Sequence, residues 1–102
     1  MYVTLMTTYK SKEVGERIIT TLLEKKLVAC IQEQEIKSHY VWEGKVEHES
    51  EKLLMMKSIE EHFEAIEACI EELHEYDVPE LVMLPITKGS KKYLNWMDEV
   101  MV

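Results

Sequence analysis

Two histidines bracket a ten-residue stretch whose spacing could place them side by side. Residues 39 to 48 read HYVWEGKVEH, with Glu43-Gly44 at the centre. If Glu43-Gly44 forms a two-residue hairpin turn, paired residue numbers sum to 87, and His39 directly faces His48. Such side chains have Cβ atoms about 5 Å apart, and two imidazoles at that distance can share one Cu²⁺ or Zn²⁺ ion. The stretch therefore predicts a candidate metal site with His39 and His48 as ligands.

Other features of the hairpin leave a second interpretation open. A type I′ turn prefers Asn or Asp before its glycine, and a three-residue loop would stagger the two histidines. Two ligands are also fewer than the three or four of a dedicated metal site. The alternative is a solvated hairpin face that carries two histidines. Of the other histidines, His74 is interpreted as a cationic cap at a helix end and His62 as a surface residue.

The sequence lacks the motifs of the common enzyme and nucleotide-binding classes. It has no G-x-S-x-G, no P-loop, no G-x-G-x-x-G and no H-E-x-x-H, and only three glycines in 102 residues. His48-Glu49 could begin a zincin motif, but Lys52 stands where its second histidine would be. These absences favour a non-enzymatic protein that requires no cofactor.

Charge, hydropathy and cysteine content limit the classes of partner that the protein can bind and indicate its cellular compartment. A formal charge of −8 argues against nucleic acid and anionic membranes as partners. No apolar run approaches the roughly 20 residues that span a bilayer, so we expect no membrane insertion. Residues 1–6 lack the pattern of a signal peptide, and Cys30 and Cys69 match no C-x-x-C spacing. We therefore expect a cytoplasmic protein with reduced thiols.

The hydrophobic pattern predicts one domain over residues 1–102 with the order β-α-β-β-α-β and a short C-terminal helix. Such a split βαβ pair forms an α+β, ferredoxin-like fold, a four-stranded antiparallel sheet with both long helices on one face. We expect a capping box from Ser58 to Glu61 at the second helix, and a free edge or bulge at Pro85. The expected elements are strands at 2–8, 27–42, 45–57 and 81–86, and helices at 12–26, 59–74 and 91–100.

The predicted sheet carries more apolar surface than two helices can cover. Segments 27–31, 53–56 and 81–84 are apolar at consecutive positions, so both faces of the sheet carry apolar side chains. Exposed patches of this kind mark an interface. We therefore predict an obligate oligomer that buries the helix-free face or the long hairpin, with Tyr40 and Trp42 of the hairpin as interface residues.

Several segments together resemble the CutA divalent-cation-tolerance family, and the similarity runs in order through essentially the whole chain. The segments that carry it are Ala29-Cys30, YVWEGK at 40–45, Lys57-Ser58, ELHEYDVPE at 72–80, Leu84-Pro85-Ile86 and Tyr93-Leu94-x-Trp96. The resemblance implies a ferredoxin-like homotrimer, similar in architecture to PII signalling proteins. It also implies a role in tolerance of copper or another divalent cation, no catalysis, and a metal ligand at Cys30.

The chain departs from the family pattern shortly after Cys30. Where the family has an Asn and then Pro-Gly, this chain has Gln32-Glu33-Gln34-Glu35-Ile36, which predicts a strand without the bulge or kink. Glu33 and Glu35 then place two carboxylates on one side of this strand. The alternative function is a PII-like sensor trimer that binds a small molecule or nucleotide in clefts between subunits, with Tyr40, Trp42 and Lys57 lining the cleft.

Overall fold

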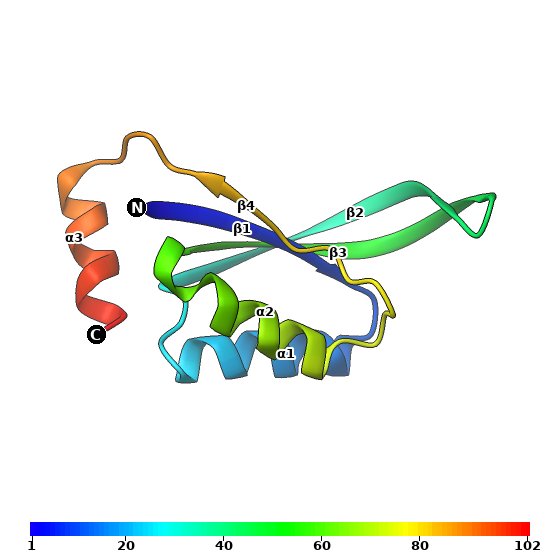
Figure 1. The fold of residues 1–102 in the computed structure, drawn as a ribbon, viewed down its shortest axis with the longest axis horizontal. Coiled ribbons are helices and arrows are strands. Elements are labelled where there is room, and N and C mark those ends of the chain that lie inside the picture. Colours follow the sequence, from blue (N-terminus) through cyan, green and yellow to red (C-terminus); the bar gives the residue numbers. More distant parts are fainter.

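A four-stranded antiparallel sheet in the order β2-β3-β1-β4 forms the centre of the structure (Figure 1). The structure is a computed structural model that describes all residues, 1–102. Both α1 and α2 lie against the same face of the sheet, and α3 stands at the end away from the hairpin tip (Figure 1). The ferredoxin-like prediction is therefore confirmed. The elements are β1 (Tyr2–Tyr9), α1 (Lys12–Glu24), β2 (Cys30–Trp42), β3 (Lys45–Ile59), a 3₁₀ turn (Glu60–His62), α2 (Phe63–Leu73), β4 (Val82–Pro85) and α3 (Lys91–Val100).

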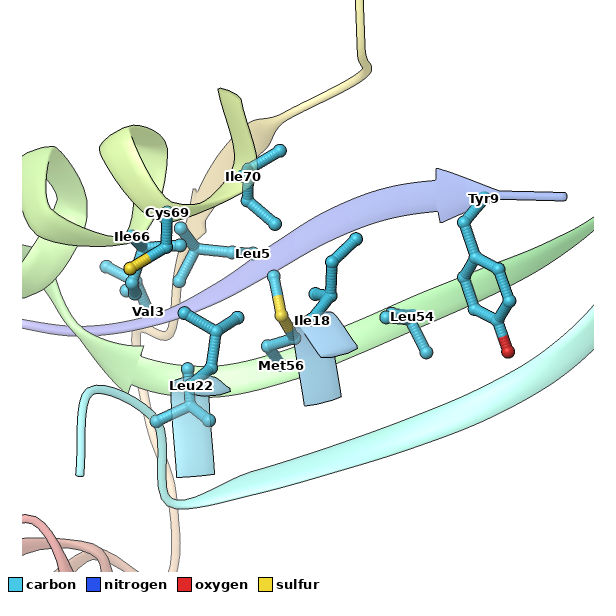
Figure 2. Close-up of a cluster of buried hydrophobic side chains, with 11 residues drawn as sticks. Val3, Leu5, Tyr9, Ile18, Leu22, Leu54, Met56, Ile66, Cys69 and Ile70 are labelled. Atoms are coloured by element: carbon cyan, nitrogen blue, oxygen red, sulfur yellow. The ribbon is translucent and has the colours of Figure 1, made fainter. Parts of the chain in front are cut away.

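Side chains of α1 and α2 pack on alternate residues of β1 and β3 to form the core (Figure 2). The hydroxyl of Ser11 accepts a hydrogen bond from the backbone N–H of Val14, so α1 begins where the sequence predicts. Burial of each large core side chain contributes roughly 1.5–3 kcal/mol to folding. The fully buried members include Val3, Leu5, Leu54 and Met56 from the sheet and Ile18, Leu22 and Ile66 from the helices.

The opposite, helix-free face of the sheet is also apolar. Side chains alternate along a strand, so the neighbours of the buried Leu5, Leu54 and Met56 point away from the helices. On β4, Val82 and Leu84 have 43% and 46% of their surface exposed. The surplus of apolar surface that the sequence predicts is therefore present. The apolar residues of this helix-free face are Met6, Leu53, Met55, Val82 and Leu84.

The start of α2 differs from the sequence prediction. Pairing with β1 continues to Ile59, so Ser58 remains in an extended strand and cannot cap a helix. Its hydroxyl is buried and donates a hydrogen bond to the carbonyl oxygen of Leu27, at 2.6 Å. Nδ1 of His62 lies 2.9 Å from the same oxygen and donates to it, so His62 holds the α1–β2 connection. The capping box is therefore wrong, and His62 has a structural role.

Both edges of the sheet follow from the sequence. The short strand β4 pairs only with β1, which gives Pro85 the free edge that it requires. At the other edge, β2 pairs with β3 without interruption from Cys30 to Trp42, as expected for a strand without a bulge. The carboxylates of Glu33 and Glu35 lie 4.0 and 3.4 Å from Nζ of Lys52, so both form ion pairs with this one cation.

Candidate metal site

The turn of the β2–β3 hairpin places the two histidines in register. Glu43 and Gly44 have φ angles of 50° and 80°, the left-handed conformation that a type I′ turn requires at both central positions. Glycine adopts it freely, whereas glutamate adopts it against its preference. Backbone pairing on both sides of the turn gives Trp42 opposite Lys45 and His39 opposite His48. The register is the one that a two-residue turn predicts.

The two imidazoles are in direct contact. Nδ1 of His39 lies 2.7 Å from Nδ1 of His48, and the ring centroids are 4.9 Å apart with an interplanar angle of 70°. One of these nitrogens must carry a hydrogen and the other must accept it. Both side chains are exposed, on the same side of the sheet as the helices. Two imidazole nitrogens that could each ligate a metal ion therefore lie side by side at a solvent-accessible position.

Cys30, the third predicted ligand, lies at the other end of β2. Nine residues of extended strand separate it from His39, a distance of about 30 Å. Burial and the neighbouring Cys30 thiol raise the pKa of the Tyr93 hydroxyl, which places this thiol beside α3. Within one chain the structure brings together His39 and His48 and leaves Cys30 apart. The chain contains no cluster of three or more His, Cys, Asp or Glu side chains suited to a metal ion.

A cavity of about 670 Å³ lies beside the hairpin. Tyr40 and Trp42 line it, whereas Lys57 does not: its ammonium donates to Oε1 of Gln32, at 2.8 Å. Five of the twelve residues that line this cavity carry a carboxylate and none is a lysine or an arginine, which suits a cation better than a phosphate. Its carboxylates belong to Glu47, Glu49, Glu51, Asp77 and Glu80.

The sequence interpretation did not include this acidic cavity, although part of its pattern is visible in the chain. Glutamates at positions 47, 49 and 51 alternate along one strand, and strand geometry places them on one face. Asp77 and Glu80 come from the α2–β4 connection, which the fold brings beside this face. The three glutamates of the strand could be found from the sequence, whereas the contribution of Asp77 and Glu80 requires the tertiary structure.

Three consecutive side chains hold the α2–β4 connection in place. Oε2 of Glu75 accepts hydrogen bonds from the backbone N–H groups of Lys10 and Ser11, at 3.2 and 2.9 Å. Nε2 of His74 donates to the carbonyl oxygen of Thr8 at 2.6 Å, and its Nδ1 accepts from the N–H of Tyr76 at 3.0 Å. An imidazole that donates at one nitrogen and accepts at the other is neutral. The interpretation of His74 as a cationic helix cap is therefore wrong.

Tyr76 connects this segment to the hairpin. Its hydroxyl donates to Oε2 of Glu51 at 2.7 Å, and Glu51 is only 9% exposed. Burial raises the pKa of Tyr76 strongly, and the hydrogen bond to Glu51 adds to the increase. Burial and the negative charge of Glu51 likewise raise the pKa of Glu80. The hydroxyl of Tyr76 therefore stays protonated and remains available as a donor to Glu51.

Replacing Tyr76 with phenylalanine should lower the free energy of unfolding by about 1–3 kcal/mol, because it removes a donor from a nearly buried carboxylate. Chemical denaturation at one protein concentration would measure this change. Tyr2→Phe is the matched control, since the Tyr2 hydroxyl donates to Asp98 at the surface, at 2.8 Å. Equal losses in both variants would show that the buried position of Glu51 has no special effect.

The fold and the hairpin define a class of protein, a ferredoxin-like α+β domain with an extended β2–β3 arm. The family model described as CutA1 divalent ion tolerance protein matches residues 3–100. Divalent-cation tolerance protein CutA of Archaeoglobus fulgidus is 40% identical over 92 residues, which cover 90% of each chain. The chain belongs to the CutA1 divalent ion tolerance family.

Structural and plant relatives agree with this assignment. The structure of the periplasmic divalent cation tolerance protein CutA from Archaeoglobus fulgidus is similar with a TM-score of 0.96, at 37% identity over 100% of both chains. Protein CutA, chloroplastic, of Arabidopsis thaliana is 42% identical over 91 residues, which cover 88% of this chain and 50% of that protein. This chain spans about half the length of such chloroplast relatives. The Archaeoglobus fulgidus protein is named for divalent-cation tolerance and not for a reaction.

Proposed function

We propose that this chain is the single-domain protomer of a non-enzymatic homotrimer that binds copper or another divalent cation and contributes to tolerance of metal ions. The observation that carries the metal-binding part is the contact between His39 and His48, whose ring nitrogens converge 2.7 Å apart. Cys30 is proposed as a separate thiol ligand. Family membership supports the link to divalent cations.

The homotrimer is supported by the apolar surface that the protomer leaves exposed. A protomer in solution would present the helix-free face together with the hairpin arm, on which Tyr40 and Trp42 are 39% and 41% exposed. Apolar patches of this extent mark protein–protein interfaces. Closed rings of identical subunits bury such a patch without leaving an open end.

Two measurements test this function on untagged protein. Analytical ultracentrifugation at micromolar concentration should give three times the 12.1 kDa mass of one chain. Equilibrium dialysis against Cu²⁺ should give at least one bound ion per chain. A monomer would contradict the assembly, and metal-free protein after dialysis would contradict the cation-binding role.

The second candidate, a PII-like sensor, is favoured by the cavity beside the hairpin. Its volume of about 670 Å³ lies within the range of small-molecule sites. The five carboxylates in its lining favour a cationic ligand and oppose a nucleotide. A thermal-shift screen separates these ligands, because a compound at 100 times its Kd stabilises the protein by about 2.7 kcal/mol.

We propose the cytoplasm as the compartment of this protein. Cys30 and Cys69 are both free thiols, as expected in a reducing compartment. None of the helices has the length and apolar character needed to cross a membrane. Cell fractionation of the native host tests this placement, which differs from the periplasmic and chloroplastic descriptions of relatives.

A further inference from the structure

The contact between His39 and His48 has no carboxylate in the cross-strand pairs that flank it. Along the same face of the hairpin, the flanking cross-strand pairs are Lys37 with Ser50 and Val41 with Val46. Neither pair contributes a carboxylate, and the hydrogen bond of each Nδ1 atom is to the other imidazole. The two nitrogen atoms therefore share a single hydrogen.

The hairpin holds the two imidazoles close to the spacing that a metal ion requires. With metal–nitrogen bonds of 2.0–2.1 Å, two nitrogen ligands are about 2.9 Å apart in a square plane and about 3.3 Å apart in a tetrahedron. The observed separation of 2.7 Å needs to open by only a few tenths of an ångström. Rotation of the side chains can supply this change while the backbone ladder stays intact.

We propose that His39 and His48 form a two-imidazole clip that binds one Cu²⁺ or Zn²⁺ ion per chain through both Nδ1 atoms. Water fills the remaining coordination positions, since both side chains are exposed. This inference rests on the proposed function and deepens it by assigning the ligands and the class of metal. Imidazole nitrogen suits Cu²⁺ and Zn²⁺, whereas Mg²⁺ and Ca²⁺ prefer oxygen ligands. Cys30 lies outside this clip.

Backbone pairing makes the clip a preformed site. Strand pairs continue on both sides of the histidines, and three residues on each strand separate the histidines from the Glu43-Gly44 turn. The two ligands are therefore fixed relative to each other before the metal arrives. Binding through the second imidazole becomes intramolecular, which raises the affinity well above that of a single histidine.

The test is calorimetric titration of full-length, untagged protein with Cu²⁺, Zn²⁺ and Mg²⁺. Either His39→Gln or His48→Gln should lower the affinity for Cu²⁺ and Zn²⁺ by about tenfold or more, because each leaves one imidazole. The matched control combines His48→Gln with Lys45→His, which keeps four histidines but puts the two imidazoles on opposite faces of the hairpin and outside the acidic cavity. It should lose affinity to the same extent. Cys30→Ser should lose only the ion held by the separate thiol ligand and keep one Cu²⁺ or Zn²⁺ ion per chain at the clip, and Mg²⁺ should not bind to the clip.

NMR spectra locate the ion independently of affinity. One equivalent of Zn²⁺ should shift the imidazole resonances of His39 and His48 and leave those of His62 and His74 unchanged. Wild-type affinity in both His→Gln variants, or zinc-induced shifts confined to the region of Cys30, would overturn the clip and leave the proposed cation-binding function standing. Wild-type protein that binds neither Cu²⁺ nor Zn²⁺ would overturn both.

Discussion

Replacing Leu53 with glutamate is expected to convert the proposed homotrimer into folded monomers. Leu53 lies near the centre of the helix-free face, between Thr8 of β1 and Gln34 of β2. It points away from the core that Leu54 helps to form, so the protomer can fold without it. Assembly would bury one added carboxylate per subunit, at an effective cost of several kcal/mol for each ion.

Analytical ultracentrifugation would detect the change as a fall in mass to the 12.1 kDa of one chain. Circular dichroism should retain the helix and strand signals of the wild type. Leu23→Glu is the matched control, because Leu23 is a 41% exposed leucine on α1, on the other side of the sheet. That variant should keep the wild-type mass. A trimeric Leu53→Glu variant would exclude the helix-free face as the assembly surface.

The fold and the hairpin register could be predicted because local patterns and long-range pairing agree in this chain. The absence of Pro-Gly leaves β2 free of a bulge, and Gly44 permits a two-residue turn, so simple counting from the turn pairs His39 with His48. Glutamate at position 43 is unfavourable for this turn. Thirteen cross-strand pairs outweigh that one unfavourable residue.

The errors occurred where a local motif competes with a partner that is distant in sequence. Ser58 has the spacing of a capping box, but pairing with Val3 keeps it in a strand. His74 stands at a helix end where a positive charge would be favourable. Its actual partners are the carbonyl oxygen of Thr8, 66 residues away, and the N–H of Tyr76, which together require a neutral ring. Local rules cannot identify such partners without the tertiary structure.

The candidate site was predicted only in part for the same reason. Cross-strand neighbours follow from counting, so His39 and His48 could be paired in advance. The separation of Cys30 from the two histidines also follows from the length of β2. Cys30 and His39 are nine residues apart on one extended strand and cannot meet within one chain. The acidic cavity could not be predicted as a whole, because Asp77 and Glu80 reach it from a different element.

The close approach of α1 to β1 depends on the absence of a side chain at Gly15. A Cβ atom built there would lie 2.1 Å from Cε2 and 2.2 Å from Cζ of Tyr9. The Tyr9 ring is almost fully buried, and its hydroxyl hydrogen-bonds to the carboxylate of Glu33 on β2. The ring is therefore held at both ends and cannot move aside without breaking that contact.

Gly15→Ala should consequently lower the free energy of unfolding by about 1–3 kcal/mol, the usual range for overpacking a core. The loss should appear even though alanine favours a helix over glycine by up to about 1 kcal/mol. Gly89→Ala is the matched control, because its nearest neighbour would be the movable Cδ2 of Leu94, at 3.0 Å. Denaturation at one protein concentration would measure both variants, since the stability of an oligomer depends on concentration. In a double-mutant cycle, Tyr9→Ala should remove the penalty at Gly15, and additive losses would contradict the direct clash.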